Sequence, residues 1–305
     1  MADATTVWRP SYAVNARLTL SVLGRGSGDP CHRLTGDGAV WRTSRMSTGP
    51  VTYRLVQRGP REVAAEAWGP GAAELIAGIP ALLGSRDDPE SFEPRHPLLR
   101  ESHRRYAGLR VPATGRVMEA LIPAILEQKV IGLDAKAAWR RLITKYGEAA
   151  PGPAPDRMRV PPSAENWRSL AAWDWHQAGV DERRARTAQI AATYATKLEA
   201  AAVTGEPAEV YRVLLALPGI GAWTAAQVGH RALGDPDALP IGDYHLASLA
   251  GWAMTGSALA EDEVMEFFEP WRPHRYRVVR LLELTPGLQP PKRGPRLSRQ
   301  DYRRV

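Results

Sequence analysis

The sequence predicts an α+β fold in which a small antiparallel sheet precedes an all-helical domain. Two patterns carry this prediction. Residues 15–22 and 51–56 alternate in the manner of half-buried strands, whereas from about residue 114 onward apolar residues recur with the period of helices. The 305 residues, 44% hydrophobic and 24% charged, are typical of a globular protein. Because single cores stop growing near ~250 residues, we expect two domains.

The N-terminal elements follow from local composition. Asn15–Val22 and Val51–Val56 are predicted strands of the sheet, and Gly71–Leu83 is a predicted helix packed on it. Residues 84–102 are polar and contain three prolines, which is typical of a domain boundary. We therefore predict a strand-rich mixed α/β domain over residues 1–90, a helical domain over 91–288 and a basic tail over 289–305.

Capping residues and turn residues delimit the helices of the second domain. An apolar face predicts a helix from Met118 through about Val130, and Asp134 is the predicted cap of the next, which ends at Gly147. Residues 150–163, with five prolines, are a predicted loop. The remaining predicted helices begin at Ser163 (to Trp173), Asp181 (to about 200), Pro207, Trp223 (to Leu233), Asp243, Glu261 (to Phe268) and His274 (to Leu284).

Several protein classes are excluded by composition. The longest apolar segment, Leu75–Leu83, is far shorter than the ~18 residues of a membrane span, and the N-terminus lacks the pattern of a secretory signal. We therefore expect a soluble, cytoplasmic protein. Cys31 is the single cysteine, which excludes an internal disulfide, a multi-cysteine zinc site and a four-cysteine iron–sulfur cluster.

Positive charge is concentrated at the C-terminus. Residues 292–305 contain six Lys or Arg and one Asp, so they carry +5 of the net +7. Such a tail is typical either of an electrostatic contact with a polyanion or of a solvated chain end. The sequence leaves both interpretations open.

The most informative segment is Leu217–Ala225, with the sequence LPGIGAWTA, between two predicted helices. Gly219 and Gly221 permit positive φ and close approach, and the start of the second helix offers unpaired N–H groups. This arrangement is suited to holding a phosphate. The alternative is an ordinary corner between helices, with glycines present for packing.

A second signal, Asp243, follows Gly221 by 22 residues and begins a predicted helix. By itself an aspartate there is usually an N-cap. Together, however, LPGIGxWTA and Gly242-Asp243-Tyr244 resemble the helix-hairpin-helix DNA glycosylases with a Gly/Pro-rich loop and an Asp, most closely their 3-methyladenine DNA glycosylase II branch. The resemblance covers residues 90–285 and is supported by the segments HPLL (96–99), GLR (108–110), AILEQKV (124–130) and WRP (271–273).

The resemblance implies binding of double-stranded DNA that contains a damaged base, with the damaged nucleotide rotated into a pocket. It places the contacts with DNA phosphates at Gly219, Ile220, Gly221 and Thr224. It places Gln128 and Lys129 near the gap that the rotated base leaves in the duplex. Asp243 takes the catalytic role, because a carboxylate stabilises positive charge that develops on the sugar. No cofactor is required, although the carbonyls of Leu217 and Ile220 are candidate ligands of a structural Na⁺ or K⁺.

Trp223 narrows the expected chemistry. Relatives that also cut the DNA backbone carry a lysine at this hairpin position, and no lysine lies between residues 198 and 291. The resemblance therefore implies a monofunctional hydrolase of alkylated purines, monomeric and nucleoid-associated. Trp223, Tyr244, Gln227 and Glu283 are the candidate base-pocket residues. Two alternatives stay open: a DNA-binding protein with altered catalysis, or a glycosylase for oxidised or deaminated bases.

Overall fold

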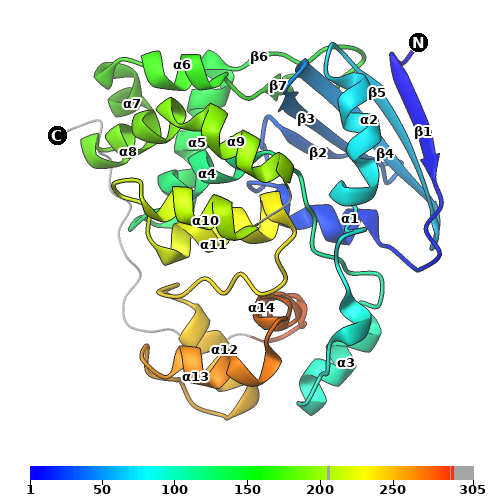
Figure 1. The fold of residues 1–305 in the computed structure, drawn as a ribbon, viewed down its shortest axis with the longest axis vertical. Helices are drawn as coiled ribbons and strands as arrows, with labels where there is room; N and C mark the ends of the chain where they lie inside the picture. The colour runs from blue at the N-terminus through cyan, green and yellow to red at the C-terminus, as the bar shows by residue number, and fades with distance from the viewer. Residues whose placement is uncertain (205–206, 289, 292–305) are drawn as a thin grey trace.

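The computed structural model describes residues 1–204, 207–288 and 290–291, so the predicted basic tail lies almost entirely outside the described residues. The N-terminal part is a five-stranded antiparallel sheet of order β1-β5-β4-β3-β2, drawn in blue in Figure 1. Its strands are β1 (Ala4–Trp8), β2 (His32–Leu34), β3 (Val40–Met46), β4 (Gly49–Gly59) and β5 (Glu62–Trp68). A short pair, β6 (Glu148–Ala149) and β7 (Arg159–Val160), lies beside it.

One face of the sheet is covered by helix α2 (Ala72–Leu82), as Figure 1 shows. Alternate residues of β4, Val51, Tyr53 and Leu55, are buried in one core with Leu75 and Ile79 of α2. The period of two in the strand therefore supplies the apolar face that the helix needs. The predicted strand over 51–56 and the predicted helix over 71–83 are both confirmed.

The strand predicted for Asn15–Val22 is wrong. The segment forms helix α1 (Ala16–Leu20) followed by the 3₁₀ turn η1 (Ser21–Leu23). Its buried apolar residues, Ala16, Leu20 and Leu23, have helical spacing, and the Asn15 side chain caps the helix by accepting from Leu18 N at 2.9 Å. A local cap therefore outweighs the strand-like alternation.

The rest of the described chain is helical, which confirms the α+β class. The longer helices are α3 (Pro97–Arg105), α4 (Val117–Leu126), α5 (Gly132–Tyr146), α8 (Glu182–Thr193), α9 (Ala195–Thr204), α10 (Pro207–Leu215), α12 (Leu246–Met254) and α14 (Arg275–Leu284). The shorter ones are η2 (Pro89–Ser91), α6 (Ala164–Ser169), α7 (Ala172–Ala178), α11 (Ala222–Val228), the π-helix η3 (Gly229–Leu233), α13 (Val264–Phe268) and η4 (Glu269–Trp271). Within the described ranges, each helix is too short or too polar to cross a bilayer.

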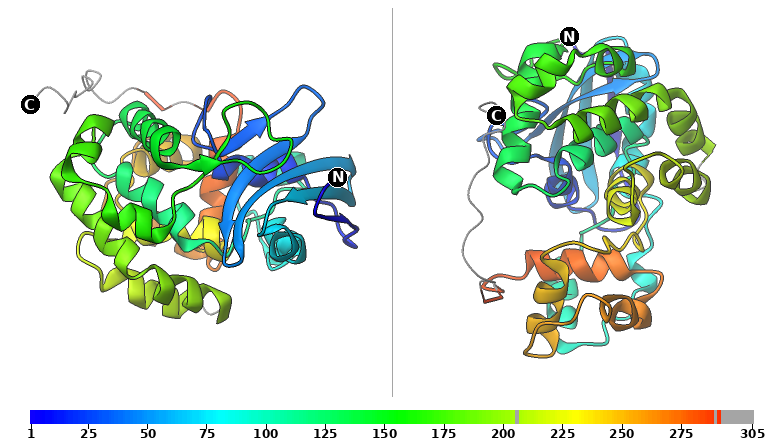
Figure 2. Two further views of the ribbon diagram at one scale, coloured as in Figure 1. Left: turned by 90° about the horizontal axis from the view of Figure 1, so that it is seen from above. Right: turned by 90° about the vertical axis from the view of Figure 1, so that its left-hand side faces the viewer.

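These helices form two separate cores. The larger core contains α4 to α11, and the smaller one joins α3 to α12, α13 and α14. Figures 1 and 2 show the smaller group as a distinct lower layer beneath the larger one. An irregular segment, residues 234–245, connects η3 of the upper group to α12 of the lower group. Any residue on this segment therefore lies at the junction of the two helical layers.

Several predicted helix boundaries are confirmed and others are wrong. Ser163 and Asp181 cap α6 and α8 through their side chains, and Gly147 follows the last residue of α5. Asp134 does not cap α5, because that helix begins two residues earlier at Gly132. The helix predicted to Val130 ends at Leu126, the one predicted from Ser163 to Trp173 ends at Ser169, and the one predicted from Asp181 is interrupted at Tyr194.

Candidate active site

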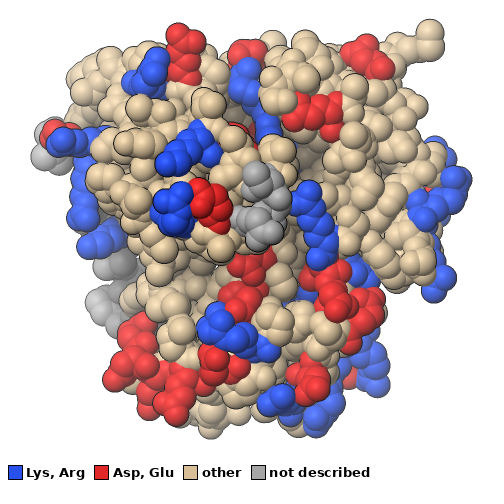
Figure 3. Space-filling view, in the orientation of Figure 1, with Lys and Arg blue, Asp and Glu red and all other residues tan. Residues whose placement is uncertain are grey.

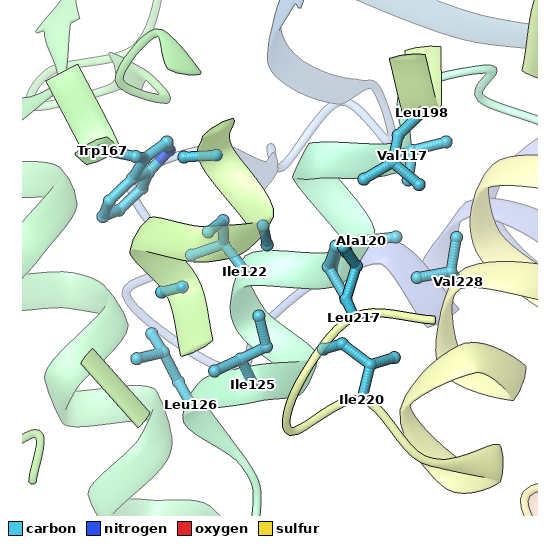
Figure 4. Close-up of a cluster of buried hydrophobic side chains, with 14 of the residues drawn as sticks. Val117, Ala120, Ile122, Ile125, Leu126, Trp167, Leu198, Leu217, Ile220 and Val228 are labelled. Atoms are coloured by element: carbon cyan, nitrogen blue, oxygen red, sulfur yellow. The ribbon is translucent and has the colours of Figure 1, made fainter. Parts of the chain in front are cut away.

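The turn between α10 and α11 is anchored from inside the protein. Leu217 and Ile220 are buried in the larger core, where Figure 4 shows them beside Ala120 and Val228. Gly219 has φ +84°, and a Cβ there would lie 2.5 Å from the Oγ1 atom of Thr187 on α8. Glycine is therefore required at 219 by both backbone conformation and packing. The structure of the hairpin is fixed before any ligand binds.

The outer side of the same turn presents backbone to solvent. Gly221 and Ala222 are exposed, and within the described part of the chain neither of their N–H groups donates a hydrogen bond to the protein. A Cβ on Gly221 would meet no atom within 4 Å. The outer side can therefore receive an anionic oxygen from outside without moving any side chain.

Gln128 joins the turn between α4 and α5 to this hairpin. Its Nε2 donates to the carbonyl of Gly219 and to the hydroxyl of Thr224, each at 2.9 Å. Thr224 is 2% exposed, so its hydroxyl faces Gln128 rather than solvent. The next residue, Lys129, is exposed with φ 55°. The structure thus brings these predicted DNA-binding residues together and leaves Lys129 as the accessible side chain.

Asp243 lies on the junction segment, opposite the hairpin helix. Its N–H donates to the Pro240 carbonyl at 3.1 Å, and Gly242 has φ +83°, as in a type II turn. One carboxylate oxygen, Oδ1, accepts from the N–H of His245 at 2.9 Å. The other, Oδ2, accepts from the indole Nε1 of Trp223, also at 2.9 Å.

The predicted N-cap at Asp243 is wrong, because α12 begins at Leu246 and its N-cap residue is His245. A turn that begins at Asp243, two residues before the N-cap, explains the bond to Oδ1 but does not explain the bond to Oδ2. That second bond comes from α11, in a different helical layer. The carboxylate is therefore held by the hairpin itself, and capping does not account for its position.

The junction segment is secured at two further places. Asp237 accepts from Nε and Nη2 of Arg275 at 2.8 and 2.6 Å, which ties it to α14. Asp235 accepts from the hydroxyl of Tyr211 at 2.5 Å, and burial together with this carboxylate raises the pKa of Tyr211. The first part of the segment is therefore bonded to α10 and to α14.

The candidate base-pocket residues occupy different environments. Tyr244 is 57% exposed, with its ring edge-on to that of His245. Gln227 is 7% exposed, and its Oε1 accepts from the guanidinium of Arg231. Glu283 pairs with Arg280 at 2.9 Å and keeps 44% of its side chain exposed.

The arginine that pairs with Gln227, Arg231, lies near a second arginine, Arg25. Arg231 also donates from Nε to the carbonyl of Val22 at 3.1 Å. Arg25 is 6% exposed and pairs with Glu127 at 3.3 Å. Burial, and to a lesser extent Arg25, lower the pKa of Arg231 to about 10. Gln227 is therefore paired with a guanidinium that also contacts the His230 ring, which is stacked on Tyr276.

Surface charge limits where a polyanion can lie. Exposed acidic side chains surround α13 at the lower left of Figure 3. They are Glu261, Asp262, Glu263, Glu266 and Glu269. This surface therefore repels phosphates and other anions.

Solved structures share this arrangement over nearly the whole chain. The 3-methyladenine DNA-glycosylase from Archaeoglobus fulgidus superimposes with a TM-score of 0.75 at 18% identity, covering 92% of this chain and 97% of that one. MBOgg1, in complex with a low-affinity DNA ligand, gives 0.71 at 15% identity over 92% and 95%. The apo 8-oxoguanine glycosylase/lyase of Clostridium acetobutylicum gives 0.68 at 12% over 92% and 95%. The chain has the helix-hairpin-helix DNA glycosylase fold.

Sequence comparison adds two curated relatives from strains of Mycobacterium tuberculosis, each named a probable bifunctional transcriptional activator/DNA repair enzyme AlkA. The chain is 34% identical to each over 175 residues, which are 54% of this chain and 34% of the relative. It therefore spans about a third of the length of the curated relatives it matches. No protein-family model matches the chain.

Within this glycosylase fold, sequence reasoning missed the bond between Trp223 and Asp243 and the two bonds made by Gln128. Both connect segments that are distant in sequence, so no local pattern indicates them. Arg231 was also missed, although a signal existed. Trp223, Gln227 and Arg231 follow one another at intervals of four residues, which places them on one face of a helix.

Proposed function

We propose that this chain is a DNA glycosylase that removes alkylated purines, such as 3-methyladenine, from duplex DNA by base flipping in base excision repair. The observation that carries the proposal is the carboxylate of Asp243, which Trp223 holds against the hairpin helix at 2.9 Å. The glycosylase fold and the DNA repair relatives support the same reaction. DNA is accordingly the proposed partner, bound by a monomer at the chromosome in the cytoplasm.

The proposed chemistry needs one carboxylate. As the bond between base and sugar breaks, positive charge develops on the deoxyribose, and a fixed negative charge beside it lowers the barrier. Asp243 cannot rotate freely, because each of its oxygens accepts a hydrogen bond. A base that already carries a methyl group and a positive charge leaves without an acid. Asp243 therefore stabilises the sugar cation or orients the attacking water.

We assign the contacts with the DNA backbone to the outer side of the hairpin. The N–H groups of Gly221 and Ala222 are available to phosphate oxygens, and such contacts read no sequence. Gln128 is engaged by Gly219 and Thr224. We therefore assign the contact with the gap left by the everted base, or with a phosphate beside it, to Lys129.

We further propose that the enzyme lacks lyase activity. A lyase needs an amine that attacks the sugar, and Trp223 stands at the hairpin position where such relatives carry lysine. Some proteins with this fold are named glycosylase/lyases. Analysis of the reaction products therefore distinguishes a glycosylase without lyase activity from a glycosylase/lyase. The expected product is an abasic site in an intact strand.

The proposal is tested with duplex DNA treated with dimethyl sulfate. Chromatography of the supernatant should show free methylated purines, and denaturing gels should show strand breaks only after heat or alkali. Breaks without such treatment would contradict the monofunctional assignment. DNA binding without any base release would instead identify a binding protein.

Trp223 is proposed as a positioning residue, and Trp223→Phe tests this role. Phenylalanine keeps an aromatic ring but removes the N–H that fixes Oδ2 of Asp243. We expect turnover to fall about tenfold, the scale of one hydrogen bond to a charged group, with the affinity for abasic DNA unchanged. A loss of affinity with unchanged turnover would contradict it.

A structural Na⁺ or K⁺ at the hairpin is also proposed. The carbonyl of Leu217 accepts one bond, from Ile220 N at 3.1 Å, and so keeps a lone pair. The carbonyl of Ile220 accepts none among the described residues. These two oxygens would hold the ion, whose charge would draw phosphate to the turn. Exchanging K⁺ for tetramethylammonium at constant ionic strength should weaken DNA binding; unchanged affinity would contradict the site.

A further inference from the structure

Resting on the proposed glycosylase function, we propose that Arg183 on α8 is a further contact with the DNA backbone, at a phosphate beside those bound by the hairpin and by Lys129. The guanidinium would bind duplexes of any sequence, because a phosphate contact reads no base. It would take no part in cleavage of the bond between base and sugar. Two buried neighbours on α8 fix the position of this residue, whereas its own side chain is exposed.

Helix α8 packs against the hairpin at the protein surface. Thr187 of α8 lies so close to Gly219 that a Cβ on this glycine would be 2.5 Å from the threonine Oγ1. Gly219 is itself exposed, so α8 meets the hairpin at its rim. The Thr187 hydroxyl donates to the carbonyl of Arg183 at 2.9 Å. The backbone of Arg183 is therefore four residues, or about 6 Å of helix, from the contact with the hairpin.

The first turn of α8 is fixed beside the turn that carries Lys129. Arg184 donates from Nη1 to the carbonyl of Leu126, the last residue of α4, at 2.7 Å. Its Nε donates to Asp181, the N-cap of α8, at 2.6 Å. Arg184 is only 3% exposed, so these bonds are shielded from solvent. Because Lys129 follows Leu126 by three residues, the start of α8 and the turn after α4 are held together.

Arg183 projects into solvent next to these two contacts. At 3.6 residues per turn it lies about 40° around the helix from Thr187 and about 100° from Arg184, on the exposed side of α8. Side chains on a helix lean toward its N-terminus, so this guanidinium lies over the first turn, the end beside the turn that carries Lys129. The exposed neighbour Glu182 lies about 100° in the opposite direction, away from Thr187 and the hairpin.

The charge of Arg183 is available to a ligand. Within the described ranges its side chain makes no hydrogen bond or ion pair. The positions three and four residues away carry no acid, since they are Gly179, Val180, Arg186 and Thr187. Other exposed arginines have a carboxylate partner three residues earlier in the chain, as in Arg104, Arg212 and Arg272. A guanidinium without such a partner is suited to a phosphate, because its planar N–H groups bind two oxygens at once.

The test measures the Kd for undamaged duplexes by fluorescence anisotropy at several KCl concentrations. We expect Arg183→Gln to raise the Kd roughly threefold to tenfold for every duplex, and to lower the slope of log Kd against log[KCl] by about one. Arg183→Lys keeps the charge and should keep the slope. Arg61→Gln is the matched control, because Arg61 is an exposed arginine in the turn between β4 and β5. It should change neither quantity.

Base release separates this inference from the proposed function. With protein in saturating excess over methylated DNA, the single-turnover rate constant of Arg183→Gln should stay within about twofold of its original value, and the melting temperature should not change. An unchanged Kd and slope, an equal loss of affinity in Arg61→Gln, slower release at saturation or a lower melting temperature would each overturn the contact while leaving the glycosylase function intact. If the unmodified protein neither bound DNA nor released a base, both proposals would fail together.

Discussion

Replacing Asp243 with asparagine is expected to lower the turnover of methylated DNA at least about 100-fold, the scale of removing one key electrostatic group from a reacting centre. The fixed negative charge beside the sugar is lost, whereas the hairpin that grips DNA is unchanged. The Kd for an undamaged duplex should therefore stay within about twofold of its original value. Single-turnover release of methylated purines and fluorescence anisotropy measure the two quantities.

The geometry supplies a control for this variant. An asparagine amide has one oxygen, yet both Oδ1 and Oδ2 of Asp243 accept from N–H donors. In Asp243→Asn one N–H therefore faces an amino group, which costs roughly 1–3 kcal/mol in folding free energy. Adding Trp223→Phe removes one donor and should restore that stability without restoring turnover. Recovery of turnover in the double variant would show that misfolding, rather than the missing charge, caused the loss.

Local chemistry made much of the fold predictable from sequence. Ser163 and Asp181 are caps in the structure because their side chains reach the N–H three residues ahead, a relation that needs no tertiary contact. The segment after Asn15 is a helix for the same reason, because the Asn15 side chain accepts from Leu18 N, although its alternating sequence is typical of a strand. The break at Tyr194 between α8 and α9 leaves no comparable local signal.

The site was predictable as a set of positions but not as a set of bonds. The glycine turn and Asp243 are visible as motifs, whereas the indole bond between them depends on how two helical layers meet. The same limit explains the wrong N-cap prediction at Asp243. An aspartate that caps a helix and an aspartate that begins a turn two residues before the cap have the same local sequence pattern. The pair Gln227 and Arg231 could have been foreseen, because residues four apart on a helix are neighbours.

Substituting Gly221 with leucine is expected to weaken binding to every duplex alike, roughly tenfold or more, the scale of losing one charge-assisted hydrogen bond. The new side chain would project from the exposed turn, where a Cβ meets no protein atom within 4 Å. It would therefore occupy the space that a phosphate needs without disturbing the fold. Anisotropy titrations with several unrelated duplexes, together with thermal melting, measure both effects.

Two further glycines separate blocked binding from damaged structure. Gly36, in the turn between β2 and β3, is exposed and equally free of neighbours, so Gly36→Leu should change neither affinity nor melting temperature. Gly219→Ala should instead destabilise the protein by roughly 1–3 kcal/mol, because φ is +84° there and Thr187 lies against it. If Gly221→Leu bound DNA as tightly as the unmodified chain, the backbone N–H groups of this turn would not be the phosphate contact. The everted sugar would then have no reason to lie beside Asp243.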